Sequence, residues 1–391
     1  NSVYRVISQL HRFNFAPRWS KTVVGFVVLV SLGMITVITL PAMSQDVSEV
    51  QPQKLAQKGK EYYEAGKLAR AIKTWQKATV AYQANDNLDG SRESYLNTAT
   101  AQQALGLYPQ SCDSILGAFD LTNKTSCSEI IEQAQTIEPQ LEGIVPMTTE
   151  AEAKFLPDVS AIDQYPDSVN KVTGLLRFGD YFRESGYPRV ATKALEMGLE
   201  TTKKLDDPLQ QTAILLSLGN TSRAIAVERQ NQFPPQTVVL DTIANSGGSA
   251  ESALSSYQPA LSYYEQAAQI APNQLDGLKA KLNSLSLLLD IKEFWQDAIA
   301  ELNQNIDLLE ISDPEFLSQI TEGATRLNIE LNQHLSPQIT AAISEIEPEV
   351  ANFPSTRTGI YGKINFAQSL IRQGRVDQNT AKILATAIQQ S

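Results

Sequence analysis

The sequence predicts an all-α protein: a right-handed α-solenoid of helical hairpins, preceded by a single hydrophobic helix. Three observations support this prediction. Small and aromatic residues recur at helical spacing in residues 55–83, the same pattern returns about 40 residues later, and 42% of all residues are hydrophobic. One hairpin of two helices cannot bury its own apolar face, so successive hairpins are expected to stack on one another.

Residues 1–44 are predicted to be a signal peptide or an N-terminal membrane anchor. The charged side chains of this leader are all basic: Arg5, Arg12, Arg18 and Lys21. Residues 23–40 then form an 18-residue stretch without a charge, and the small residues after it suit cleavage behind Ser44. Because 18 lies between a signal core of about 7–15 residues and a membrane span of about 20, cleavage and a retained anchor both stay open. In either case the remainder is expected to be exported, periplasmic or extracellular, since basic residues hold the leader in the cytoplasm.

Residues 45–121 are predicted to contain the first two repeats. In the first, the residues expected to pack between two antiparallel helices are Leu55, Gly59 and Tyr62, then Ala71, Trp75 and Ala78. Gly66 lies between the two helices, where the chain needs a residue that tolerates positive φ. The same offsets, 40 residues on, fall at Tyr95, Ala99, Gln102, Gly106, Ser111, Ile115 and Ala118.

Residues 122–168 are predicted to be an irregular spacer packed on the solenoid. Four prolines interrupt any long helix there: Pro139, Pro146, Pro157 and Pro166. Only residues 130–137 and 149–155 are expected to form short helices. The two cysteines, Cys112 and Cys127, are 15 residues apart, one in the second repeat and one in this spacer. A disulfide is favoured in an exported chain, and two buried free thiols are the alternative.

Residues 169–391 are predicted to contain repeats three to seven. The third repeat has its packing positions at Leu175, Gly179, Phe182, Gly186, Ala191, Leu195 and Gly198. The fourth opens with Leu215 and Gly219, and its second helix is marked by Ala260, Tyr264 and Ala267. Residues 228–257 intervene as an insertion, which is expected to be a loop. Such a loop is either part of a binding face or a tolerated surface insertion.

The last repeats are less regular in sequence. A fifth hairpin, with its turn at Phe294 and Trp295, is indicated by Leu282, Ser286, Leu289, Ala298 and Leu302. Residues 316–335 and 338–346 are expected to form a degenerate sixth pair. Residues 355–373 then predict a helix that ends at Gly374, and a final helix begins at Gln378.

The sequence offers no arrangement of residues for catalysis, a cofactor or a metal. Its two histidines are His11, in the leader, and His334, which is expected at the surface near a helix end. No glycine-rich phosphate-binding motif is present. Without the leader the chain has 28 basic and 43 acidic residues, a balance that repels nucleic acid and anionic lipid. Membrane contact is therefore expected only through the N-terminal segment.

The function predicted from these observations is that of a non-catalytic scaffold. Helical solenoids bind a protein or peptide along the concave face that the first helix of each pair lines. The solvent-facing candidates for this contact are Lys60, Glu61, Glu64, Asn97, Gln103, Arg177, Asp180, Arg183, Asn220 and Arg223. Their side chains do not identify the partner.

The repeat unit resembles the tetratricopeptide repeat, whose pattern is L-G-x-x-Y followed by A-x-x-x-F. Lys58 stands here at the leucine position and Trp75 at the phenylalanine position. Residues 215–225 (LLSLGNTSRAI) and 355–371 (STRTGIYGKINFAQSLI) are similar to segments of exported cyanobacterial proteins. In that family a tetratricopeptide array precedes a C-terminal, caspase-like CHAT domain.

The resemblance implies a second hypothesis, in which this chain is the regulatory N-terminal part of a CHAT-type peptidase. The peptidase members of that family use a histidine and a cysteine. Nothing in the sequence matches the CHAT domain itself, and the chain ends before that domain would begin. No catalytic residue is therefore assigned from the resemblance.

Overall fold

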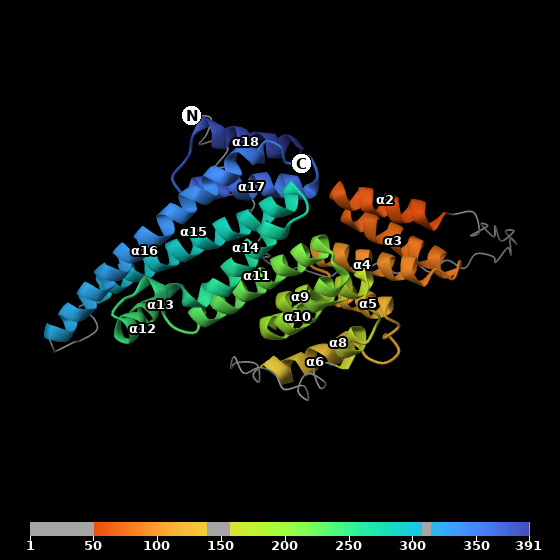
Figure 1. Ribbon diagram of the computed structural model, residues 1–391, viewed down its shortest axis with the longest axis horizontal. Coiled ribbons are helices and arrows are strands. Elements are labelled where there is room, and N and C mark those ends of the chain that lie inside the picture. Colours follow the sequence, from red (N-terminus) through yellow and green to blue (C-terminus); the bar gives the residue numbers. More distant parts are fainter. Residues whose placement is uncertain (1–50, 139–156, 307–313, 391) are drawn as a thin grey trace, which may run out of the picture. The chain divides into compact units, whose positions relative to one another are not determined.

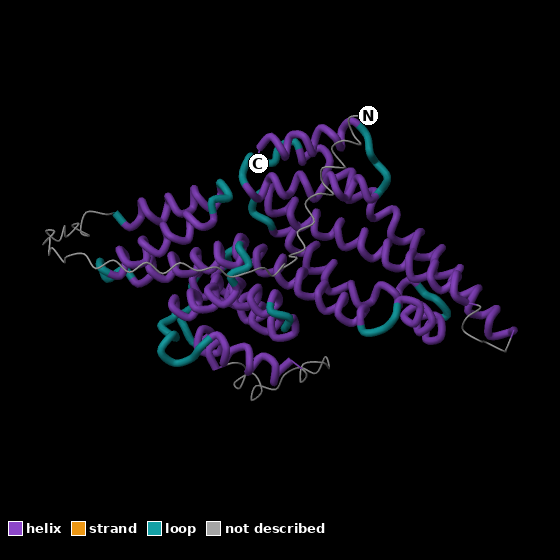
Figure 2. The backbone as a smooth tube through the Cα atoms, turned by 180° about the vertical axis from the view of Figure 1, so that it is seen from behind, coloured by secondary structure: helices purple, strands orange, loops and turns teal. Residues whose placement is uncertain are grey.

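The computed structural model describes residues 51–138, 157–306 and 314–390, and the regular elements in these ranges are helices. Figure 1 shows them in chain order, and Figure 2 shows the same backbone from behind, with no strand in the described part. The all-α prediction is confirmed for these residues. The predicted leader lies outside them. None of the described helices is both long and apolar enough to cross a membrane.

The first two hairpins are α2 (Pro52–Glu64) with α3 (Leu68–Gln83), and α4 (Leu88–Ala104) with α5 (Tyr108–Ala118). Gly66 and Gly106 have φ values of 71° and 72°, so each turn uses the left-handed conformation that favours glycine. A Cβ added to Gly59 would lie 2.5 Å from the indole nitrogen of Trp75, which shows how closely α2 and α3 approach.

Two further pairs follow the same plan: α9 (Val169–Glu184) with α10 (Pro188–Leu205), and α11 (Pro208–Asn231) with α14 (Gln258–Ile270). Gly179 packs on Leu195, and Gly219 on Tyr264. Of the packing positions named from the sequence, Leu55 and Tyr62 are half-buried. Tyr95 and Ser286 are half-buried as well, and Gly186 at its turn is exposed. The buried positions include Gly59, Ala71, Trp75, Ala78, Ala99, Gly179, Phe182, Ala191, Gly219, Ala260, Tyr264 and Ala267.

The predicted spacer contains two helices in its described part, α6 (Cys127–Ile137) and α8 (Pro157–Asp163). α6 starts with a capping box, in which the Ser126 side chain accepts from the Glu129 backbone and Glu129 accepts from the Ser126 backbone. Ile130 and Ile162 are fully buried in the same apolar cluster as Phe178 of α9. α6 confirms the short helix predicted at residues 130–137. The described part of the spacer packs on the helix pairs, as predicted, but as ordered helices rather than as an irregular segment. The short helix predicted at residues 149–155 lies outside the described residues.

The structure joins the two cysteines by a disulfide, with 5.9 Å between the Cα atoms of Cys112 and Cys127. Cys112 belongs to α5 and Cys127 is the first residue of α6. The bond therefore ties the spacer to the second hairpin.

The insertion at residues 228–257 is helical, so the prediction of a loop is wrong. α11 runs on to Asn231 and is followed by α12 (Pro235–Ser246), α13 (Ala250–Leu254) and the 3-10 turn η4 (Ser255–Tyr257). Val239 of α12 and Leu254 of α13 are buried in the apolar cluster that also contains α15 and α16 side chains. The reason is in the sequence of the insertion, which carries enough apolar residues to pack on the helices beside it.

The predicted fifth and sixth hairpins are also wrong. They are replaced by two long helices, α15 (Gln274–Asn305, 32 residues) and α16 (Pro314–Val350, 37 residues), which pack on each other. α15 continues through Phe294 and Trp295 because no glycine or proline occurs between Leu278 and Asn305. α16 continues through Pro337, since Leu335 and Ile339 keep the buried stripe in register on either side of it.

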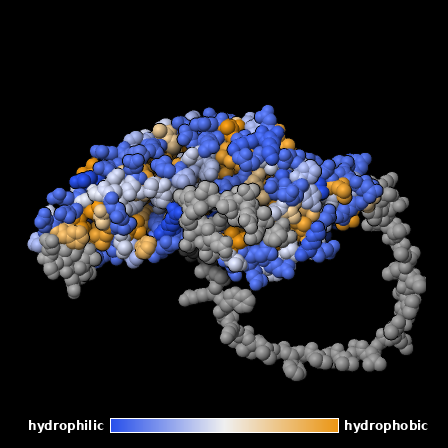
Figure 3. Space-filling view, turned by 60° about the horizontal axis from the view of Figure 1, so that its bottom comes forward, coloured by the Kyte–Doolittle hydropathy of each residue, from blue (hydrophilic) through white to orange (hydrophobic). Residues whose placement is uncertain are grey.

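The chain closes with α17 (Arg357–Arg372) and α18 (Gln378–Gln390), joined through Gly374 at a φ of 73°. The described residues after 168 thus form four helix pairs, where the sequence predicted five repeats, because α15 and α16 are each about as long as a whole repeat hairpin. On the face drawn in Figure 3, hydrophilic residues cover most of the described surface and apolar ones lie in scattered patches.

Candidate protein-binding groove

A hollow of about 560 Å³ lies between the first helices of successive pairs, α4, α9, α11 and α15. Each of these helices begins at a side-chain cap that accepts from its first-turn backbone: Asn87, Ser168, Asp207 and Asn273. The groove residues of α11 and α15 come from the first half of each helix, and those of α9 extend from its first residue to Arg177, just past its middle. We call this hollow the first-helix groove.

Apolar side chains form part of the lining, and two of them are unusually exposed. Val169 of α9 is 49% exposed and Leu209 of α11 is 50% exposed, and both lie in the first turn of their helix. Leu176 and Leu216 lie deeper in the same hollow, where they are buried and half-buried. An exposed apolar rim over a concave surface is typical of a site that a partner covers.

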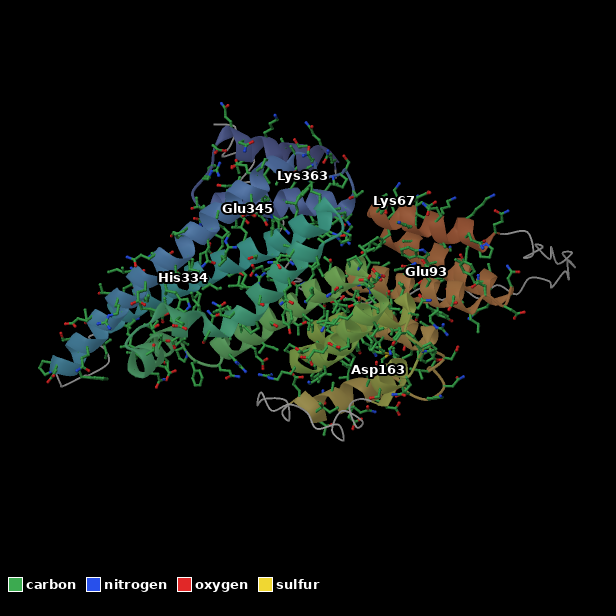
Figure 4. The ribbon with its side chains drawn as sticks, in the orientation of Figure 1. Lys67, Glu93, Asp163, His334, Glu345 and Lys363 are labelled. Atoms are coloured by element: carbon green, nitrogen blue, oxygen red, sulfur yellow. A yellow bond between two sulfur atoms is a disulfide. The ribbon has the colours of Figure 1, made fainter. Side chains whose placement is uncertain are left out.

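Polar groups in the groove include amides with free hydrogen-bonding capacity. The Asn97 side chain makes no hydrogen bond to any described residue, and Asn170 makes only a long one, 3.5 Å to the Asp89 carbonyl. Each amide both donates and accepts, which matches the N–H and C=O groups of an extended peptide backbone. Glu93, which Figure 4 places on α4, also lines the groove and has no cation within 4.0 Å among the described residues.

The other charges of the groove are paired, Lys279 with Asp276 inside the groove and Arg177 with Asp180 outside its lining. Lys279 Nζ lies 2.6 Å from Asp276 Oδ1 on α15. Arg177 Nη1 donates to Asp180 Oδ2 at 3.1 Å. The groove therefore presents one unpaired carboxylate together with two neutralised cations.

Three of the predicted contact residues, Arg177, Asp180 and Arg183, come together as the sequence spacing indicated. They are half-buried, with side-chain exposures of 23%, 19% and 22%, so the prediction that they face solvent is wrong. Asp180 accepts from Ser217 Oγ of α11 at 2.6 Å, and Gln103 of α4 donates to the Arg177 carbonyl at 2.8 Å. The cluster thus links α4, α9 and α11. These contacts also stabilise its charges, because a charge buried at a helix contact is costly unless a partner lies beside it.

The candidates on α11 also make contacts between helices. Asn220 Oδ1 accepts from the Tyr264 hydroxyl at 2.8 Å. Burial raises the pKa of that hydroxyl to about 12. Arg223 pairs with Asp290 of α15, which in turn accepts from Arg372 of α17 at 2.8 Å. Neither side chain is a free contact residue on the surface.

The remaining candidates are exposed but separate from the groove. Lys60, Glu61 and Glu64 lie on α2 and do not line it. His334 is exposed, as predicted, but it lies in the interior of α16 and not near a helix end (Figure 4). Among the described residues, no group of three or more His, Cys, Asp and Glu side chains is placed to hold a metal ion.

Sequence reasoning missed most of the groove. Val169, Leu209 and Asn170 were not candidates, although each follows a Ser or Asp helix cap by one or two residues. The first two positions after the caps of α9 and α11 would have found these three residues, although the same positions of α4 and α15 do not line the groove.

No protein-family model matches this chain, and no curated protein matches it. Among solved structures, the tetratricopeptide-repeat domain of P58(IPK) aligns with 87% of this chain and 98% of its own length, at 13% sequence identity and a TM-score of 0.13. A likeness at that TM-score carries no argument.

Proposed function

We propose that this chain is a non-catalytic scaffold of tetratricopeptide-like repeats that binds an extended peptide segment of a partner protein in the first-helix groove. The observation that carries the proposal is the free amide of Asn97 beside the exposed apolar rim of Val169 and Leu209. The amide can hold a peptide backbone, and the rim can cover an apolar side chain of the peptide. The unpaired carboxylate of Glu93 favours a peptide with a basic residue.

The first test selects peptides on the whole protein from a random library and measures their affinity for variants. Asn97→Ala and Asn170→Ala together should weaken binding about tenfold, the loss expected for one or two net hydrogen bonds. Asn303→Ala is the matched control, because Asn303 is exposed on α15, lies outside the groove and makes no side-chain hydrogen bond to a described residue. Equal affinities for the double variant and the control would contradict the proposal.

A second test locates the peptide directly. A photo-crosslinking amino acid at Val169 should capture the selected peptide. The same amino acid at Ile329 of α16, which is 51% exposed, should not. Equal capture at both positions would place the binding site elsewhere.

Export is part of the proposal, and the disulfide between Cys112 and Cys127 supports it, because disulfides persist in oxidising compartments. N-terminal sequencing of the mature protein should find Gln45 if the leader is cleaved. Full-length protein in the membrane fraction would favour the anchor, and recovery from the cytosol would contradict both. Regulation of a CHAT-type peptidase stays a prediction, which a downstream coding sequence with His and Cys motifs would test.

A further inference from the structure

A second hollow, of about 430 Å³, lies in the part of the chain that interrupts the fourth repeat. It is open to solvent on one side and is lined by the end of α11, by α12, by α13 with η4, and by α15. None of its lining residues belongs to the first-helix groove. We call it the insertion pocket, and its volume lies in the range of about 300–1,000 Å³ that is usual for small-molecule sites.

Aromatic side chains form much of the wall of the insertion pocket. Phe233 is 58% exposed at its edge, and Tyr257, Phe294 and Trp295 contribute from η4 and α15. Phe294 and Trp295 meet edge to face, with 5.5 Å between ring centroids. Such a wall favours a flat, apolar ring, because aromatic pairs gain from offset and edge-to-face contact.

The buried indole of Trp295 has an N–H group with no acceptor among the described residues. Trp75 provides a comparison inside the same chain: it is equally buried, at 3% exposed, and its Nε1 donates to the Ala56 carbonyl at 3.0 Å. Buried tryptophan N–H groups usually find a partner, so the unpaired one calls for an acceptor supplied from outside the chain. Trp295 lines the insertion pocket, and its Nε1 is covered by neighbouring atoms, so an acceptor in the hollow reaches this donor through a small shift of the ring or of the wall.

A cation lines the same hollow. Arg229 of α11 is exposed, and no described carboxylate lies within 4.0 Å of its guanidinium. Several other polar groups of the wall are already used: the Tyr257 hydroxyl donates to Gln230, and Thr242 Oγ1 donates to the Val238 carbonyl at 2.8 Å. Asp241, the acidic residue of the lining, accepts from Asn245 at 2.8 Å. The donors left without a partner among the described residues are Trp295 Nε1 and Arg229, and Asp241 is a carboxylate with no described cation within 4.0 Å.

We propose that the insertion pocket binds a small carboxylate that carries an aromatic ring on a short alkyl chain. The aryl ring packs on the aromatic wall, and the carboxylate accepts hydrogen bonds from the donors left unpaired, Trp295 Nε1 and Arg229. A carboxylate is favoured over a neutral acceptor, because a charge-assisted hydrogen bond to arginine is about twice as strong as a neutral one. This site is independent of the peptide groove and does not rest on the function proposed for it.

The experiment observes the indole N–H signals of the whole protein, labelled with ¹⁵N at tryptophan, during titration with biphenyl-4-acetate, naphthalene-2-acetate and 3-phenylpropionate. Trp75→Phe and Trp295→Phe assign the signals. At least one of the three acids should move the Trp295 signal downfield and leave Trp75 unchanged, since the Trp75 N–H already has an acceptor. If none of them moves the Trp295 signal at about 1 mM, a concentration that detects even weak binding, the pocket holds only water and the proposal is wrong.

A matched pair of ligands and a matched pair of variants then test the charge. Arg229→Gln should weaken the acid about tenfold and leave its primary amide unaffected. Arg70→Gln is the control, because Arg70 is exposed on α3, far along the chain from the pocket, and its guanidinium has no described carboxylate within 4.0 Å. Equal binding of acid and amide, or an equal effect of the two arginine variants, would overturn the assignment of a carboxylate. Melting temperatures near that of the parent confirm that both variants are folded.

Discussion

Replacing Gly179 by alanine tests whether the helix axes of a repeat approach as closely as the structure shows. A Cβ at this position would lie 2.5 Å from both Cγ and Cδ2 of Leu195, and 3.1 Å from Cδ1. Leu195 is fully buried, so it has little room to turn away. The substitution therefore forces α9 and α10 apart or pushes the leucine off its rotamer.

Two opposing effects decide the size of the change. Alanine favours a helix over glycine by about 1 kcal/mol. Overpacking of a filled core costs about 1–3 kcal/mol, and two atoms at 2.5 Å place this site in the upper half of that range. We therefore expect Gly179→Ala to lower the free energy of unfolding by about 1–2 kcal/mol.

Gly277 of α15 provides the matched control. Its added Cβ would meet the Ala271 Cβ at 3.5 Å, which is an ordinary contact. Gly277→Ala should therefore stabilise the protein by about 0.5–1 kcal/mol through helix propensity alone. The same one-carbon change should thus have opposite signs at the two positions.

Urea unfolding, followed by helical circular dichroism, measures both effects, and the slope with denaturant should stay that of the parent. A double-mutant cycle adds a second check, because Leu195→Ala removes the atoms that clash. In that background Gly179→Ala should become stabilising, like the control. If Gly179→Ala stabilises the parent as much as Gly277→Ala does, the close approach of α9 and α10 is wrong.

Three further predictions follow from other contacts. Digestion without reduction should yield one peptide that contains both Cys112 and Cys127, linked by the disulfide. Cys112→Ala should lower the free energy of unfolding by about 3 kcal/mol, the value for a 15-residue loop. Free alkylation of both cysteines in the native protein would contradict the disulfide. Arg223→Glu puts a second carboxylate beside Asp290 and should lower the free energy of unfolding in urea by about 1–2 kcal/mol. Lys60→Glu, at an exposed position, should lower it by less than about 0.5 kcal/mol. Equal losses in the two variants would refute the pairing of Arg223 with Asp290. Lys363 is buried, and desolvation lowers its pKa below the ordinary 10.5, so the unfolded chain binds more protons between those two pKa values. The free energy of unfolding of the parent, relative to that of Lys363→Met, should therefore rise with pH up to about 10.5. If this difference does not change with pH, the pKa of Lys363 is not lowered in the folded protein.

The regular hairpins could be predicted because each is specified by local signals. Gly66, Gly106 and Gly186 all take positive φ at the turns, and a small residue faces a large one across each pair. α15 could not be derived from the 40-residue period, since that period was extended past the last glycine that supports it, Gly219. The absence of helix breakers was the stronger signal there, and it predicts one long helix.

The candidate site was harder to predict than the fold because helical spacing says which residues share a face and not what covers that face. Arg177 and Asp180 were correctly placed together on one helix, yet their charges are satisfied by each other and by Ser217 from the next pair. Arg223 is likewise held by a residue 67 positions away. Partners at such separations depend on how hairpins stack, which no local pattern encodes.

The unbroken course of α15 also bears on how the protein opens. In a regular repeat array each unit touches only its neighbours, so units can unfold one after another. α3 follows that rule and packs mainly on α2 and α4, whereas α15 packs on α11, α12, α14, α16 and α17. Loss of α15 would remove the support of all these helices at once. We therefore expect native-state amide hydrogen exchange to give one shared opening free energy for the helices from α11 to α17. In α2 and α3 the opening free energies should be lower and should differ from one helix to the next. Opening free energies that change gradually along all the described helices would contradict this.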